Sequence, residues 1–251
     1  TPSLLLFFVG VTSSINYSFA SDDGAVSETV KYEECMAAID LDAERAFDLA
    51  LEWRTLGGGN PARHCAAAAL MALGHYKDAA KRLEYLAQQP TDEVRLRTSL
   101  LQQSAQSWSL AGDNEHAYAT LTAAINIDDT DPKLFLERGA VQANMKLYVR
   151  AVDDLSRCLA LDPVSVDAYT FRASAYRYLD RLDLAITDLN HALALEPNHI
   201  EALLERGIVK RLSGDKSGAR QDWSSLLDID PNSAISEIAR HNIQLLVVNS
   251  N

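Results

Sequence analysis

The chain has 251 residues, enough for one large domain or two small ones, and 47% of them are hydrophobic, an ordinary share for a globular protein. The net charge is −12 and Lys and Arg are scattered, which argues against nucleic acid as a partner because an acidic surface repels phosphate. Alanine and leucine dominate, and no alternating Val, Ile and Thr stretch is typical of a strand, so the composition favours an all-α fold.

The first segment, residues 1–20, has the features of a secretory leader. Residues 3–11 read SLLLFFVGV, an apolar run too short to span a bilayer as a helix. Ser18 and Ala20 then place small residues three and one positions before a junction at Ser21, a pattern that signal peptidase accepts. The alternative is a buried N-terminal helix. We expect a cleaved signal peptide, a flexible linker over residues 21–32, and a periplasmic or secreted location.

Residues 33–97 contain two weaker helical patterns. Residues 42–57 read DAERAFDLALEWRTLG and residues 73–79 read LGHYKDA. The run GGGNP at residues 57–61 lets one helix stop and another start at Pro61. It lacks the Lys-Ser/Thr ending of a phosphate-binding loop.

His64 and Cys65 raise the question of a nucleophilic or metal site, with Glu52 nearby in the sequence. Adjacent residues on a helix point in different directions, which disfavours a catalytic pair. None of the six His residues has another ligand at metal-binding spacing. We therefore expect no catalytic residue, no metal and no cofactor.

The strongest pattern lies in residues 98–233, where similar sequences recur every 34 residues, starting at Thr98, Pro132, Val166 and Ile200. Position 8 of each repeat is Ala or Gly, and position 20 is always Ala. Small residues at these positions predict two antiparallel helices in close contact. Large apolar residues fill the space around that contact at position 24: Leu121, Leu155, Leu189 and Trp223.

Positions 7 and 23 of the repeat vary together. Three repeats have Arg at position 7 and Asp at position 23, whereas the first has Ser104 and Thr120. Loss of both partners together is what a contact between the two helices would produce. A catalytic Arg/Asp site would have to occur three times, so we predict structural ion pairs: Arg138 with Asp154, Arg172 with Asp188, and Arg206 with Asp222.

The combined pattern closely resembles the tetratricopeptide repeat, in four copies over residues 98–233. Residues 33–97 fit degenerate units of the same kind, four extra residues near 90–97 break the phase, and residues 234–251 fit a C-terminal capping helix and tail. The resemblance implies an all-α, right-handed superhelical solenoid of antiparallel helix pairs, with five to six repeats and a capping helix.

The repeat frame also places the three cysteines. Cys35 and Cys65 fall on the first helices of neighbouring units, which lie side by side in such a solenoid. We expect a disulfide between them, which suits an oxidising compartment; the alternative is two buried thiols. Cys158 takes a small buried position and is expected to be a free thiol.

In the family, positions 2, 5, 9 and 12 of the first helix face a concave groove. The carboxylate clamp that grips chaperone C-termini needs Lys at position 5 and Asn at position 9, and this chain lacks both. The groove suits a peptide or partner helix with apolar anchors and an acidic group. Its predicted partner-binding residues are Gln102, Gln106, Leu136, Thr170, Ser174, Arg177, Leu204, Ile208 and Arg211.

Three functions remain open at this stage. The first is a non-enzymatic interaction scaffold, since the chain resembles exported bacterial tetratricopeptide-repeat proteins that act as adapters in envelope assembly. The second is a subunit or assembly factor of a membrane-bound complex, held by the edge of the solenoid, so that any membrane association comes through that complex. The third is an enzyme with a site around His64, Cys65 and Glu52. The sequence does not identify the protein partner.

Overall fold

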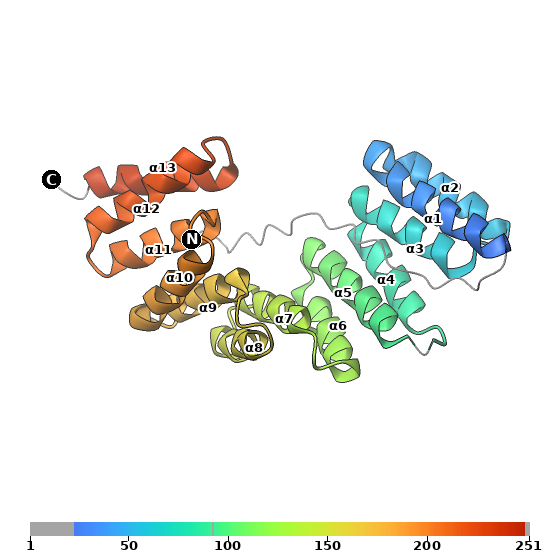
Figure 1. Cartoon of the computed structure of the whole chain (residues 1–251), viewed down its shortest axis with the longest axis horizontal. Coiled ribbons are helices and arrows are strands. Elements are labelled where there is room, and N and C mark those ends of the chain that lie inside the picture. Colours follow the sequence, from blue (N-terminus) through green and yellow to red (C-terminus); the bar gives the residue numbers. More distant parts are fainter. Residues whose placement is uncertain (1–22, 92, 249–251) are drawn as a thin grey trace. The chain divides into compact units, whose positions relative to one another are not determined.

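The computed structural model describes residues 23–91 and 93–248, and within them every regular element is an α-helix. The helices follow one another as antiparallel pairs, six in all, with a thirteenth helix after the last pair (Figure 1). The expected all-α fold of helical repeats is therefore confirmed. The helices are α1 (Asp23–Leu41), α2 (Ala43–Thr55), α3 (Gly59–Ala72), α4 (Tyr76–Ala87), α5 (Val94–Leu110), α6 (Asn114–Ile127), α7 (Pro132–Asn144), α8 (Tyr148–Leu161), α9 (Val166–Tyr178), α10 (Leu182–Leu195), α11 (Ile200–Leu212), α12 (Lys216–Ile229) and α13 (Ala234–Val248).

The chain forms two compact units, one ending at Leu134 and the other beginning at Phe135. In the first unit α1 packs against α2 and α3, and α5 packs against α4 and α6. In the second, α9 packs against α8, α10 and α11, and α13 packs against α11 and α12. Ile235, Ala239 and Leu246 of α13 are buried in the core of the second unit, so this helix covers the apolar end of the stack.

The N-terminal boundary differs from the expectation. Residues 23–32, predicted as part of a flexible linker over 21–32, belong to α1, so the helical region starts before residue 33. Tyr32 and Cys35 of α1 are buried in the core that α1 forms with α2 and α3. The predicted signal peptide, residues 1–20, lies outside the described residues.

The small positions of the repeat are where paired helices approach each other. The alanines at position 20 are fully buried in all four repeats, as is the large residue at position 24 in the last three. Two repeats have Gly at position 8. A Cβ at Gly207 would lie 2.2 Å from Trp223 Nε1, and one at Gly139 would lie 2.8 Å from Leu155 Cγ. The large Trp223 and the missing side chain of Gly207 therefore fit each other.

Position 15 forms the turn between the two helices of a repeat, and it has a positive φ in the five helix pairs from α3–α4 to α11–α12. Gly74, Gly112 and Gly214 occupy it with φ of 78°, 76° and 91°. Lys146 and Asp180 occupy the same position with φ of 62° and 58°. This left-handed conformation suits glycine and is unfavourable for residues with a Cβ.

Candidate partner-binding face

A buried chain of polar side chains links the first helices of the first unit. Tyr32 Oη on α1 lies 2.8 Å from His64 Nδ1 on α3, and His64 Nε2 lies 2.9 Å from Gln103 Oε1 on α5. These contacts suit a neutral imidazole that accepts from the tyrosine hydroxyl and donates to the glutamine. His64 is fully buried, and this desolvation lowers its pKa from 6.5 to about 4, although the bond to Gln103 opposes the shift.

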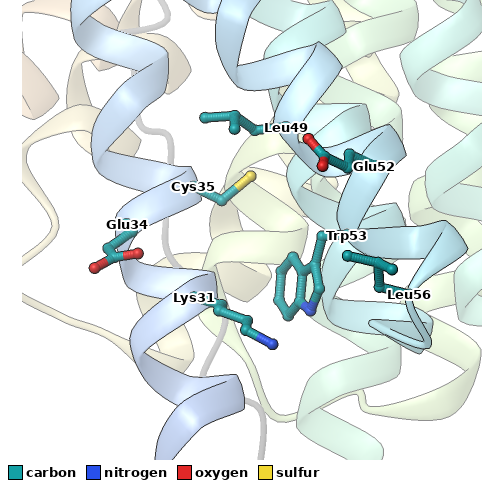
Figure 2. Close-up of a pocket in the computed structure, with 7 residues that line it drawn as sticks. All are labelled: Lys31, Glu34, Cys35, Leu49, Glu52, Trp53 and Leu56. Atoms are coloured by element: carbon teal, nitrogen blue, oxygen red, sulfur yellow. The ribbon is translucent and has the colours of Figure 1, made fainter.

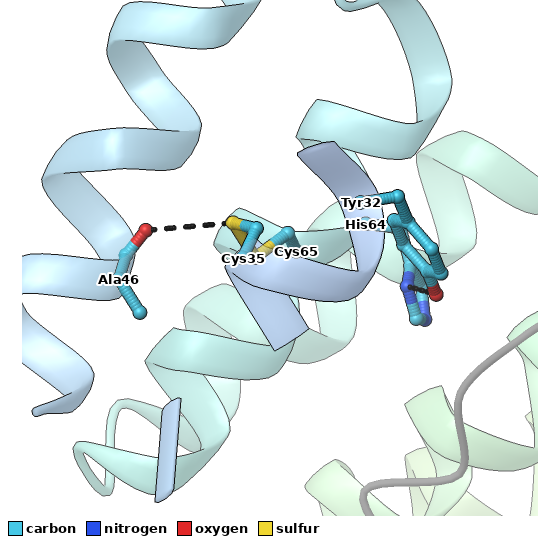
Figure 3. Close-up of a disulfide and its surroundings, with 5 residues drawn as sticks. All are labelled: Tyr32, Cys35, Ala46, His64 and Cys65. Carbon is cyan, nitrogen blue, oxygen red and sulfur yellow. Dashed lines mark hydrogen bonds between the residues drawn. A yellow bond between two sulfur atoms is a disulfide. The ribbon is translucent and has the colours of Figure 1, made fainter. Parts of the chain in front are cut away.

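The predicted disulfide lies next to this chain and is confirmed. Cys35 on α1 and Cys65 on α3 are joined with a Cα–Cα distance of 6.3 Å, and both are buried. Figure 3 shows the bond beside Tyr32 and His64, with Cys35 Sγ 3.8 Å from the Ala46 carbonyl oxygen of α2. The remaining cysteine, Cys158, is a free buried thiol, as expected.

Glu52 of the first unit does not share a site with His64 and Cys65. It lines a pocket of about 210 Å³ between α1 and α2, shown in Figure 2. Neither His64 nor Cys65 lines this pocket, and the Cys65 sulfur is committed to the disulfide. The three residues of the enzyme hypothesis therefore do not form one site. The pocket is lined by Lys31, Glu34, Cys35, Leu49, Glu52, Trp53 and Leu56.

Glu84 on α4 is a structural residue that sequence reasoning missed. Its Oε1 accepts hydrogen bonds from Trp108 Nε1 at 2.8 Å, Thr120 Oγ1 at 3.0 Å and Ser104 Oγ at 3.3 Å. The one available signal was that Ser104 and Thr120 replace the Arg/Asp pair of the later repeats. A carboxylate from the preceding helix takes over the link between α5 and α6.

The second unit has all three Arg/Asp contacts between paired helices. Arg172 Nε and Nη2 each lie 2.8 Å from an oxygen of Asp188, and Arg138–Asp154 and Arg206–Asp222 have the same two-bond geometry. The three aspartates are buried. The bond to Asp188 raises the pKa of Arg172. This geometry is more buried and better aligned than that of the partly exposed pairs expected from the sequence.

The first helices α9 and α11 provide most of the residues predicted to face a groove, and two of them do not reach the surface. Thr170 and Ser174 on α9 are each only 4% exposed, and Thr170 Oγ1 donates to the Val166 carbonyl oxygen. Burial argues against a direct contact of these two side chains with a partner, and their partner-binding role stays a prediction. Small side chains here let α9 and α11 lie close together.

Arg177 also differs from the expectation of a free groove cation. Its guanidinium forms an ion pair with Glu205 on α11, and its Nη2 lies 3.3 Å from Ser174 Oγ. It also lies over the Tyr178 ring at 4.2 Å, and Tyr178 stacks on Tyr148 of α8 at 4.5 Å. Arg177 therefore ties neighbouring first helices together.

The remaining predicted residues are partly exposed on their first helices. In the second unit Leu136, Leu204, Ile208 and Arg211 lie on α7 and α11, and in the first unit Gln102 and Gln106 lie on α5. We call Leu204, Ile208 and Arg211 the α11 face. The Nε atom of Arg211 is buried and has no hydrogen-bond partner.

Within residues 23–91 and 93–248, no cluster of three His, Cys, Asp or Glu side chains could hold a metal ion. No helix in the same ranges is long and apolar enough to cross a bilayer.

Sequence and structure comparisons relate the chain to tetratricopeptide-repeat proteins. The model of the tetratricopeptide repeat matches residues 166–199, which include α9 and α10. No curated protein matches the chain.

Among solved structures, residues 41 to the end of MamA from Desulfovibrio magneticus RS-1 align with a TM-score of 0.58 at 18% identity, covering 74% of this chain and 97% of that one. YrrB, described as a tetratricopeptide-repeat protein with an unusual peptide-binding site, aligns with a TM-score of 0.54 at 15% identity, covering 72% and 91%. The Cut9–Hcn1 hetero-tetramer of APC/C aligns with a TM-score of 0.67 at 18% identity, covering 87% of this chain but only 42% of that chain. The chain therefore carries a tetratricopeptide repeat at residues 166–199 and has the fold of tetratricopeptide-repeat proteins.

Proposed function

We propose that this chain is a non-enzymatic scaffold that binds a segment of a partner protein along the α11 face. The observation that carries the proposal is the fold itself, a stack of helix pairs like that of YrrB, whose description includes a peptide-binding site. The α11 face adds two partly exposed apolar side chains, Leu204 and Ile208, as anchors for such a segment. Against an enzyme, Cys65 is in a disulfide and both ring nitrogens of His64 are hydrogen-bonded.

The proposal includes export to the bacterial periplasm or cell surface. The buried Cys35–Cys65 disulfide supports it, because disulfides persist in oxidising compartments. The mass of the mature protein from its native cell tests this point. A chain beginning at Ser21 is expected, and an intact N-terminus would instead favour a cytosolic scaffold.

Partner binding is tested by gentle affinity purification of the C-terminally tagged chain from its native cells, followed by mass spectrometry. We expect a stoichiometric partner that is lost with Leu204→Ser. Leu195→Ser is the matched control, because Leu195 is 45% exposed on the second helix α10. Circular dichroism checks that both variants keep the fold. The absence of any stoichiometric partner, or equal loss with both variants, would contradict the proposal.

A second candidate is a subunit or assembly factor of a membrane-bound complex, held by the N-terminal edge of the stack. It is favoured by the α1–α2 pocket, beside which Leu56 is 76% exposed and Leu49 is 42% exposed. In this case Leu56→Ser would abolish capture of the complex and Leu204→Ser would not. One fixed set of membrane-complex subunits would then co-purify in constant ratio.

A further inference from the structure

Arg177 and Arg211 occupy the same position in successive repeats, 34 residues apart, and their surroundings differ. Arg177 on α9 is satisfied by Glu205 on the next first helix and by Ser174 on its own helix. The residues 34 positions after these two partners are Ala239 on α13 and Ile208 on α11. The positions equivalent to both hydrogen-bonding partners therefore hold apolar residues.

The result of this replacement is an incompletely satisfied cation. The Nε atom of Arg211 is buried and has no hydrogen-bond partner. A buried guanidinium N–H without an acceptor is unfavourable, and an acceptor that reaches it would relieve this cost. Arg177 shows which acceptor suits this place in the repeat, namely a carboxylate lying beside the guanidinium.

Neighbouring acidic groups in the second unit are engaged elsewhere. Asp222 on α12 binds both Arg206 and Lys210 of α11. Glu237 at the start of α13 pairs with Arg240 of the same helix. Glu201 and Glu205 of α11 interact with His199 and Arg177. These contacts leave none of these four acidic side chains to play for Arg211 the part that Glu205 plays for Arg177.

We propose that Arg211 binds a carboxylate group of the partner segment, with an apolar side chain of the same segment lying against Ile208. This inference rests on the proposed function and narrows it to an acidic partner segment. Ile208 lies three residues before Arg211 on α11, so the two side chains share one face of the helix. A partner segment with an acidic residue next to an aliphatic one would place the acid at Arg211 and the aliphatic side chain at Ile208.

The first test uses butyrate, which carries one carboxylate and a short aliphatic chain, with butyramide as its neutral isostere. The Nε–Hε signals of the arginines are followed by ¹⁵N NMR on the full chain, and R211M assigns the Arg211 signal. We expect butyrate to shift the Arg211 signal saturably and to shift the Arg177 signal much less, because Glu205 already occupies that guanidinium. An unchanged Arg211 signal, or an equal response to butyramide, would overturn the inference.

The second test repeats the purification of the partner with R211M. We expect at least a tenfold loss of the partner, with the far-ultraviolet circular dichroism unchanged, whereas R181M, at an exposed arginine before α10, should retain it. Retention of the partner by R211M would refute the carboxylate contact and leave the scaffold function intact. If the wild-type chain captures no partner, the scaffold function fails, and the butyrate titration alone decides whether Arg211 is a carboxylate site.

Discussion

Ser104 on α5 and Thr120 on α6 donate hydrogen bonds to the same oxygen atom, Oε1 of Glu84 on α4. In the later repeats these two positions hold an arginine and an aspartate that bind each other directly. The α5–α6 pair is thus linked through a third helix, α4. One carboxylate holds α4, α5 and α6 together, and Trp108 adds a third bond to the same oxygen.

Glu84→Ala should therefore destabilise the first unit by about 2–4 kcal/mol, because it leaves the Trp108 and Thr120 donors without their charged acceptor. Hydrogen exchange followed by mass spectrometry measures this loss in the amides of α4, α5 and α6. The exposed Glu93, at the start of α5, provides the control in Glu93→Ala. Equal exchange in the two variants would show that the shared carboxylate contributes no stability.

The register of the repeats could be predicted from the sequence because small residues recur at fixed spacing. Ala79 and Leu83 are both fully buried, although their unit lies out of phase with the later ones. The four extra residues near 90–97 lengthen α5, which has 17 residues where α7, α9 and α11 have 13. An additional turn of helix absorbs the insertion, so the helix contacts on either side keep their pattern.

Which residues of the groove are exposed and free of internal partners could not be predicted from the sequence. The repeat frame gives the direction of each residue on its own helix, but the exposure of Thr170 and Ser174 depends on how closely the next first helix approaches. The ion pair of Arg177 with Glu205 joins two repeats and has no counterpart 34 residues later. Glu84 was missed for the same reason, since it comes from the preceding unit.

The glycine-type turn at position 15 predicts a stabilising substitution. Lys146→Gly should raise the stability of the second unit by about 0.5–1 kcal/mol, because Lys146 holds a φ of 62° that glycine adopts without strain. Thermal unfolding should show a rise in Tm of about 1–4 °C. Arg220→Gly, at an exposed position inside α12, should lower Tm by a similar amount. A fall in Tm with Lys146→Gly would contradict the claim that the backbone at Lys146 is strained.

The ion pair between Arg172 and Asp188 should show strong coupling. Arg172→Met leaves the buried Asp188 carboxylate without its two-bond partner and should cost about 2–3 kcal/mol. The double variant Arg172→Met, Asp188→Leu should recover most of that loss, because no buried charge remains. A double-mutant cycle in urea unfolding measures the coupling. Additive losses would mean that the pair contributes no more than an exposed one.

Removal of the disulfide should destabilise the first unit. The Cys35→Ala, Cys65→Ala variant opens a loop of 30 residues, which corresponds to about 3–4 kcal/mol in the loop-entropy model. Limited proteolysis should then release α1 fastest. The unfolded, unreduced wild-type chain should contain one reactive thiol, Cys158. Three reactive thiols would show that the bridge does not form, and Cys158→Ala serves as the control for proteolysis.

His64 should make the first unit sensitive to acid. Its pKa is about 4 in the folded chain and near 6.5 when unfolded, so between these pH values the unfolded chain binds the proton and the folded chain does not. The free energy of unfolding should therefore fall as the pH drops from 6.5 towards 4, by about 3 kcal/mol in total. The contribution of neutral His64 to that free energy is fully present above pH 6.5. Urea unfolding between pH 7 and 4.5 measures the slope. His64→Gln should remove this component, whereas His75→Gln, at an exposed position before α4, should leave it unchanged. An equal slope in the wild-type and His64→Gln chains would show that the buried imidazole is not the group that titrates.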